Sequence, residues 1–224
     1  MDFSFKSRQI AQLRAKFRNL SNVIWISDWI ESLPLLGIGS FDLTICLGVI
    51  HHIKNPEKGT SILRDSQRIS GGANLMVYGK YGRAGIYHMQ ELMKKVNMGV
   101  SIIHEELKNA KIVIYSLPDH HWFNSNYYRD HKTMGDVGVY DLILHKRDIS
   151  YDIKGLYTLI EQGCYNYVNY DNILGMDTMI WRPNKLSRTS VKVLSRSSNL
   201  NQMLSGEIIS SKMVTHSIYM KNSN

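Results

Sequence analysis

The sequence predicts an α/β protein built on an open sheet, because residues 41–79 read as strand, helix, strand. FDLTICLGVI is an almost continuous apolar run that follows a Gly/Ser-rich turn, and ANLMVYG is a second such run. Continuous apolar runs are typical of parallel strands that are buried on both faces. The crossover between two such strands is right-handed, and ligands bind outside the carboxyl ends of the strands. A site is therefore expected near Val49 to His52.

The connecting helix is predicted to begin at Pro56 and to continue to Ile69. Asn55 can cap its N-terminus, and proline is favoured at the first helical position. Gly71 and Gly72 are expected to end the helix before the second strand. This segment is the best-defined unit of the chain, and the other elements can be placed around it.

Length and composition indicate one ordinary globular domain over residues 1–224. The chain has 43% hydrophobic and 21% charged residues, with no internal repeat. No apolar segment approaches the roughly 20 residues that span a bilayer, and the N-terminus lacks a signal peptide's apolar region. A cytoplasmic protein with no membrane partner is expected. Two cysteines, Cys46 and Cys164, make neither a disulfide framework nor a C-x-x-C site.

The net charge of +8 favours an acidic partner such as RNA, but the basic residues are spread along the chain. Solvated surface charge is therefore preferred to nucleic-acid binding. The histidines also fail to predict a metal site. His120 and His121 are adjacent, and the others show neither H-x-x-x-H nor H-E-x-x-H spacing, so no metal is expected.

Several spaced motifs agree with these elements: FDL, then LGVIHHIKNPEKG, an R-x-x-G-G turn in QRISGG and a hydrophobic strand. Together they resemble strand four, helix D and strand five of the class I S-adenosylmethionine (SAM)-dependent methyltransferases. The continuation MVYGKYGRAGIYHMQEL is similar to a narrower bacterial group of these enzymes. The resemblance extends from Asp2 to about Tyr219 and is weakest between Ile173 and Leu200. It implies a Rossmann-like sheet with flanking helices and the strand order 3-2-1-4-5-7-6.

The resemblance also implies where SAM would be held. Asp2 matches the acid after strand two that binds both ribose hydroxyls, since a carboxylate can accept two hydrogen bonds from a diol. Asp28 matches an acid that accepts from the adenine amino group, and Trp29 matches the next residue, which offers its backbone. An alternative stays open for Asp28, which can instead cap the helix that follows. Leu47 and Gly48 are expected to contact the cofactor through their backbone.

The acceptor side is predicted from the ends of the two central strands. His51 is the candidate catalytic group, because it ends the first strand and an ordinary histidine pKa suits a base near neutrality. His52 is expected to point away from His51 and to bind a neighbouring loop. Tyr81 and Arg83 follow the second strand and are candidates for acceptor binding. The acceptor itself is not identified by the sequence.

The remaining elements are predicted from local patterns. A helix is expected over 6–20, capped by Ser4 or Ser7, and a short strand over 22–27. Tyr87, Leu92 and Val96 suggest the buried face of another helix, and the segment 101–118 suggests a further one that is ended by Pro118. The remaining expectations are a His-rich lid loop over 119–138, a helix and strand in 149–171, loops over 173–200, and a final helix and strand.

One expected motif is missing from the sequence: an acid followed by G-x-G-x-G after strand one. The chain is therefore expected to lack strand one and most of strand two. Residues 1–115 would then be the remaining cofactor-side part, and 116–224 the lid loop, late strands and C-terminal segment. Three hypotheses follow: a truncated methyltransferase with impaired cofactor binding, which is preferred; a non-catalytic interaction module that binds RNA; and a nicotinamide-dependent Rossmann enzyme, which fits HHIKNP poorly.

Overall fold

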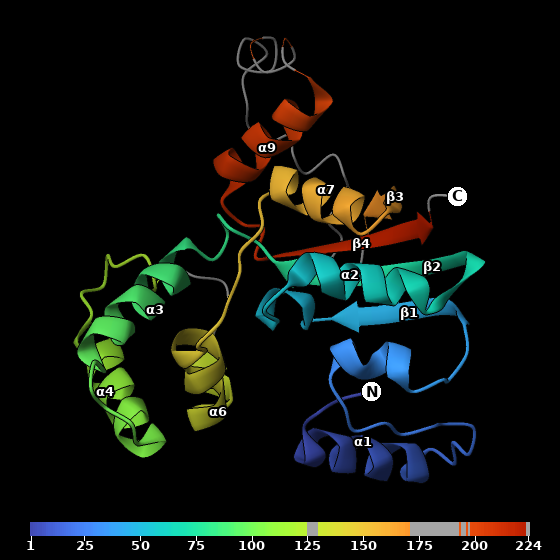
Figure 1. The fold of residues 1–224 in the computed structure, drawn as a ribbon. Helices are drawn as coiled ribbons and strands as arrows, with labels where there is room; N and C mark the ends of the chain where they lie inside the picture. Colours follow the sequence, from blue (N-terminus) through green and yellow to red (C-terminus); the bar gives the residue numbers. More distant parts are fainter. Residues whose placement is uncertain (125–129, 171–192, 194–195, 197, 223–224) are drawn as a thin grey trace.

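The computed structural model describes residues 1–124, 130–170, 193, 196 and 198–222 (Figure 1). Most of the segment 173–200, for which loops were expected, lies outside the described residues. The described elements, in chain order, are α1 (Phe5–Phe17), η1 (Ile30–Leu35), β1 (Phe41–Leu47), η2 (Ile50–His52), α2 (Pro56–Asp65), β2 (Gln67–Tyr78), α3 (Ala84–Val96), α4 (Ile103–Ser116), α5 (Asp130–Thr133), α6 (Gly135–Val139), η3 (Tyr140–Leu144), α7 (Ile153–Gln162), β3 (Tyr165–Tyr170), α9 (Asn199–Ser210) and β4 (Thr215–Asn222).

The described strands form one mixed sheet in the order β1-β2-β4-β3. β1 and β2 are parallel, with Ile45 opposite Asn74, and α2 makes the crossover between them. β4 runs antiparallel to both of its neighbours, β2 and β3. The predicted α/β sheet and its parallel strand–helix–strand unit are confirmed. The resemblance implied the strand order 3-2-1-4-5-7-6. The observed order β1-β2-β4-β3 corresponds to its last four strands, 4-5-7-6.

The helix ends mostly follow from the local sequence. Ser4 caps α1 by accepting a hydrogen bond from the Ser7 amide, as one of the two predicted alternatives required. Asp152 caps α7 in the same way, accepting from the Gly155 amide, and Gly163 ends that helix. Asn55 stands at the N-cap of α2 but makes no side-chain cap hydrogen bond. Pro56 occupies the first position of α2, as predicted.

The predicted end of α2 is wrong. The helix stops at Asp65, and β2 begins at Gln67, so the QRISGG segment belongs to the strand. Gly71 does not end the helix. Instead it allows a close approach in the sheet, since a Cβ there would lie 3.0 Å from the Phe41 carbonyl oxygen. The register of β1 against β2 shifts between Phe41 and Leu43, next to this contact.

The strand predicted over 22–27 is also absent from the structure. A strand forms only where a neighbour satisfies its backbone groups, and no described strand lies beside this segment. Its contact with the N-terminal residues is a single backbone hydrogen bond of 3.1 Å, from the Asp2 amide to the Ile26 carbonyl. Hydrophobic and β-branched residues alone were therefore insufficient to form a strand here.

β1 lies at the edge of the described sheet, where its only strand partner is β2 (Figure 1). The prediction that both of its faces are buried is wrong. Leu43, Ile45 and Leu47 are 53%, 65% and 46% exposed, whereas Cys46 on the other face is buried. In the described sheet, the backbone edge of β1 on the side away from β2 is therefore unpaired.

Two hydrophobic clusters hold the structure together. The first lies between the sheet and helices α2 and α7, with Leu75, Val77 and Ile218 from the strands and Leu156 and Ile160 from α7. The second cluster joins α3, α4, α6 and η3, which Figure 1 shows beside the sheet rather than across its face. Its residues are Ile86, Met89, Met93, Ala110, Phe123, Val139, Leu142 and Ile143.

The buried face of α3 differs from the prediction. Leu92 and Val96 are 38% and 40% exposed, while Ile86 and Met93 are buried in the second cluster. The segment 119–138, expected as a lid loop, contains α5 and most of α6, and Phe123 is buried beside His131; residues 125–129 lie outside the described residues. None of the described helices is long and apolar enough to cross a bilayer.

Candidate functional site

The candidate site begins where β1 ends. The chain turns at Gly48, whose φ of +75° is a conformation that glycine adopts without strain. The Gly48 amide still donates to the Met76 carbonyl at 3.2 Å, so the turn stays attached to β2. The short helix η2 follows and carries His51 and His52. This placement at the carboxyl end of a parallel strand is the one predicted from the sequence.

His51 is completely buried at this position. Its ring centroid lies 3.9 Å from that of Tyr78, at the end of β2, and 4.1 Å from that of His52. Neither ring nitrogen has a hydrogen-bond partner among the described residues. Burial, with smaller contributions from His52, Arg83 and His145, lowers the pKa of His51 to about 2. The ring is therefore neutral near pH 7, and the ordinary pKa assumed from the sequence does not apply to it.

His52 does not point away from His51, as was predicted, because η2 is a 3-10 turn and not a continuation of the strand. The His52 Nδ1 lies 2.9 Å from the Arg147 carbonyl oxygen. A carbonyl can only accept, so Nδ1 carries the proton in the neutral ring and Nε2 keeps its lone pair. On its other side the His52 ring lies 4.0 Å from the ring of His145. Burial lowers the pKa of His52.

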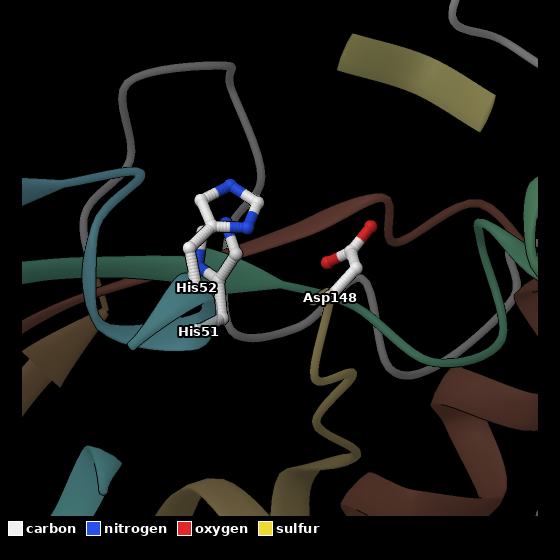
Figure 2. Close-up of side chains that lie close together, drawn as sticks. All are labelled: His51, His52 and Asp148. Carbon is white, nitrogen blue, oxygen red and sulfur yellow. The ribbon is translucent and has the colours of Figure 1, made fainter. Parts of the chain in front are cut away.

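Asp148 faces the two histidines from the segment between η3 and α7, as Figure 2 shows. Its side chain is only 1% exposed. The Oδ2 atom accepts a hydrogen bond from Gln90 Nε2 at 2.9 Å and lies 3.5 Å from a terminal nitrogen of Arg83. The Oδ1 atom is buried and has no hydrogen-bond partner among the described residues. One oxygen is thus fixed by neighbours, and the other is free to bind a ligand.

The two residues predicted to bind the acceptor have different surroundings. Arg83 is 2% exposed, pairs with Asp148, and stacks its guanidinium 3.6 Å from the centroid of Tyr78. It therefore belongs to the cluster around His51. Tyr81 is half-buried in the loop after β2, with the Lys80 ammonium 5.5 Å from its ring centroid. Among the described residues, no hydrogen bond or ring contact joins Tyr81 to the residues around His51.

The residues predicted to hold the cofactor lie in two places. Asp2, Asp28 and Trp29 come together near the N-terminus, where the rings of Phe3 and Trp29 stack with centroids 4.3 Å apart. Leu47 and Gly48 lie at the end of β1, next to the turn into η2. The structure therefore divides the predicted cofactor residues into a group near the N-terminus and a group at the end of β1.

Asp28 accepts local hydrogen bonds, but it does not cap the helix that follows. The N-cap of η1 is Trp29, and it makes no side-chain cap hydrogen bond. The Oδ1 atom of Asp28 accepts from the Ser32 hydroxyl at 2.6 Å and from the Trp29 amide at 2.8 Å, and these bonds lower the pKa of the carboxyl. In Asp2, Oδ1 accepts from the Ser4 amide at 2.8 Å. These bonds use only Oδ1, so the Oδ2 atom of each carboxylate has no partner among the described residues.

A cavity of about 230 Å³ borders the cluster on the side of α3 and η3. Gln90 and His145 line it, and the same two residues contact Asp148 and His52. Lys94 and Glu106 add opposite charges to its wall. A small molecule or a side chain entering this cavity would therefore approach the cluster from the side of α3 and η3.

Sequence reasoning missed Asp148, Gln90, Arg147 and Tyr78. Asp148 is 96 and 97 positions after the two histidines and stands in a charged segment, HKRDIS, that reads as surface loop. No spacing rule connects it to HH. A usable signal was the placement of this segment just before the capped helix α7, since such a loop returns to the edge of the sheet where β1 and β2 end.

Comparisons with known proteins agree with this architecture. No family model matches the sequence. Two solved structures of PKMT2 from Rickettsia typhi, one of them in complex with AdoHcy, match the whole chain with a TM-score of 0.67 at 15% and 16% identity. The fold is that of a Rossmann-like methyltransferase. The chain spans 44% of the length of PKMT2.

A curated relative also matches most of this chain. The uncharacterized protein syc1184_c from Synechococcus is 25% identical over 216 residues, which include 90% of this chain and 48% of the relative. The chain thus spans about half the length of the proteins it matches.

Proposed function

We propose that this chain contributes to a SAM-dependent methyltransferase, as the half of the fold that carries the acceptor side of the site. The observation that carries this proposal is the order β1-β2-β4-β3 with an antiparallel β4 second from one edge, together with a buried histidine at the end of β1. The fold shared with PKMT2, one of whose structures contains AdoHcy, supports the same function.

SAM would be held by residues that still have free acceptor atoms. The unpartnered Oδ2 atoms of Asp2 and Asp28 fit the ribose hydroxyls and the adenine amino group, and the Gly48 turn leaves room beside the backbone. SAM supplies an activated methyl group on sulfur. The protein therefore has to orient the acceptor in line with it and exclude water.

Binding of the methionine end of SAM requires a part of the fold that the sequence does not provide. The glycine-rich loop of the resemblance has no counterpart in the sequence, and only glycines allow such close backbone approach to a ligand. We propose that a strand carrying this loop pairs with the free edge of β1 and covers Leu43, Ile45 and Leu47. The chain without it would be impaired in cofactor binding and catalysis.

The test uses a version of the chain extended at its N-terminus by a strand, glycine loop and helix. Calorimetry with S-adenosylhomocysteine is expected to give binding with a 1:1 stoichiometry. An extended protein that is folded by circular dichroism and does not bind S-adenosylhomocysteine would refute the proposed function. If that extended protein instead binds RNA in a salt-sensitive way, the result would favour the interaction-module hypothesis.

A further inference from the structure

We infer that His51, His52 and Asp148 form a binding site for a divalent transition-metal ion such as Zn²⁺. One ligand atom from each of the three residues lies within 4.8 Å of the other two (Figure 2). Two imidazole nitrogens and one carboxylate oxygen are the donor set of three-ligand zinc sites and of mononuclear iron sites. The sequence did not suggest this site, because adjacent histidines do not have the usual ligand spacing.

The first argument is that the cluster contains buried polar atoms without partners. Both ring nitrogens of the fully buried His51 and the Oδ1 atom of Asp148 have no hydrogen-bond partner among the described residues. Leaving such an atom unsatisfied costs roughly 1–3 kcal/mol. In the neutral ring one His51 nitrogen carries the proton, so the other nitrogen and Asp148 Oδ1 each offer a lone pair without a partner. Two such lone pairs in one cluster point to a ligand that accepts them, and a metal ion does so.

The second argument comes from the groups behind the ligands. Metal-bound histidines usually donate their other ring N–H to an oxygen, and metal-bound carboxylates are themselves hydrogen-bonded. His52 does this through Nδ1 to the Arg147 carbonyl, which leaves Nε2 for the metal. Asp148 does it through Oδ2 to Gln90, which leaves Oδ1.

The geometry requires only a small closure. Ligand distances near 2.0–2.2 Å place tetrahedral ligand atoms about 3.5 Å apart, and the ligand atoms lie within 4.8 Å of one another, so they must approach by about 1.3 Å or less. His52 is half-buried and has more room to move than the enclosed His51. Three protein ligands leave at least one coordination position for a ligand arriving from the neighbouring cavity.

Arg83 is the feature that opposes a cation. Its guanidinium lies 3.5 Å from Asp148 Oδ2, and its charge repels a metal ion. However, Arg83 binds the oxygen that Gln90 also holds and is stacked on Tyr78, so it orients the carboxylate without occupying Oδ1. We expect an affinity below that of a site with no nearby cation, and a preference for nitrogen-binding metals over Mg²⁺.

The experiment measures metal binding by the 224-residue chain and needs no cofactor, so its failure would leave the methyltransferase proposal untouched. After dialysis against a chelator, the protein is titrated with Co²⁺, whose visible absorption reports coordination by nitrogen, and then with Zn²⁺ as competitor. We expect one Co²⁺ per chain, displaced by Zn²⁺ and not by equimolar Mg²⁺. The absence of stoichiometric binding would overturn the inference.

Two variants and one control locate the site. His52→Gln and Asp148→Asn preserve size and should each weaken Co²⁺ binding at least tenfold, the effect expected for loss of a ligand. His104→Ala, on the exposed surface of α4, should leave it unchanged. Thermal unfolding of each variant checks that it is folded. Equal Co²⁺ affinity in wild type and both folded ligand variants would overturn the inference and assign the binding to surface histidines.

Discussion

The Nε2 atom of His216 lies 3.1 Å from Oε1 of Glu207, and both side chains are completely buried. The same nitrogen lies 3.0 Å from the Tyr151 carbonyl, which takes the hydrogen bond, while Oε2 of Glu207 accepts from the Ile153 amide. This pair joins β4 to α9 and to the first turn of α7. Its position between three elements makes it a structural connection rather than part of the site around His51.

Glu207→Gln should lower the free energy of unfolding by about 2 kcal/mol or more, because it removes the charge opposite His216 and weakens the bond to the Ile153 amide. Urea unfolding measures this change. The control is Glu91→Gln, which breaks the exposed ion pair with Lys95 and should change stability by less than about 0.5 kcal/mol. Equal effects of the two substitutions would show that the buried pair contributes nothing specific.

Gly82→Ala should destabilise the protein, because a Cβ at this position would overlap the Met213 carbonyl in the segment that leads into β4. We expect a loss of about 2 kcal/mol or more, as for other overpacked backbone contacts. Gly155→Ala is the matched control. It adds the same methyl group to α7 with only ordinary contacts, and should stabilise by roughly 0.5–1 kcal/mol. If Gly82→Ala has the wild-type free energy of unfolding, the close approach of Gly82 to the Met213 carbonyl would be contradicted.

The parallel unit, the late helix–strand pair and the last strand were predictable because their patterns are local. Apolar runs of strand length, a proline at the start of α2 and a capping Asp152 act within a few residues. The strand over 22–27 and the burial of β1 were not predictable, because both depend on whether a neighbouring strand is present. The residue pattern indicates that a segment can form a strand. It does not indicate whether a second strand lies beside it.

The candidate site was predictable only in part, for a similar reason. His51 follows from its position at the end of a strand, and Arg83 from the loop after the next strand. Asp148 and Gln90 come from distant segments whose packing against the strand ends is decided by the second hydrophobic cluster. The pKa of His51 is likewise a consequence of burial, which no residue near it in sequence reveals.

The two thiols should react at very different rates. Cys46 is buried in β1, and burial raises its pKa to about 12, so it stays a protonated thiol in the folded protein. Cys164 is exposed after α7. A colorimetric thiol reagent at pH 8 should therefore label one cysteine in the native protein and two in denaturant, with Cys164→Ser leaving none in the native state. Rapid labelling of both native thiols would contradict the burial of Cys46.

Asp28→Ala should weaken binding of S-adenosylhomocysteine to the extended protein by about tenfold or more, the effect of one lost polar contact. Its Oδ2 atom is the one proposed to meet the adenine amino group. Ser32→Ala is the control, since it removes the local bond to Oδ1 while leaving Oδ2 in place. If calorimetry gives the wild-type affinity for Asp28→Ala, the residue serves only its local bonds to Ser32 and Trp29.

The central claim is that this chain is the β1-β2-β4-β3 half of a SAM-binding sheet and that a strand with a glycine loop completes the site along β1. The most direct measurement compares S-adenosylhomocysteine binding by the 224-residue chain with binding by the extended version, using calorimetry on both. The extended protein should bind at least about a hundredfold more tightly, since the short chain lacks several hydrogen bonds and the preorganised loop that makes them. Equal affinity of the two proteins would contradict the claim, because the cofactor would then be held without the proposed strand.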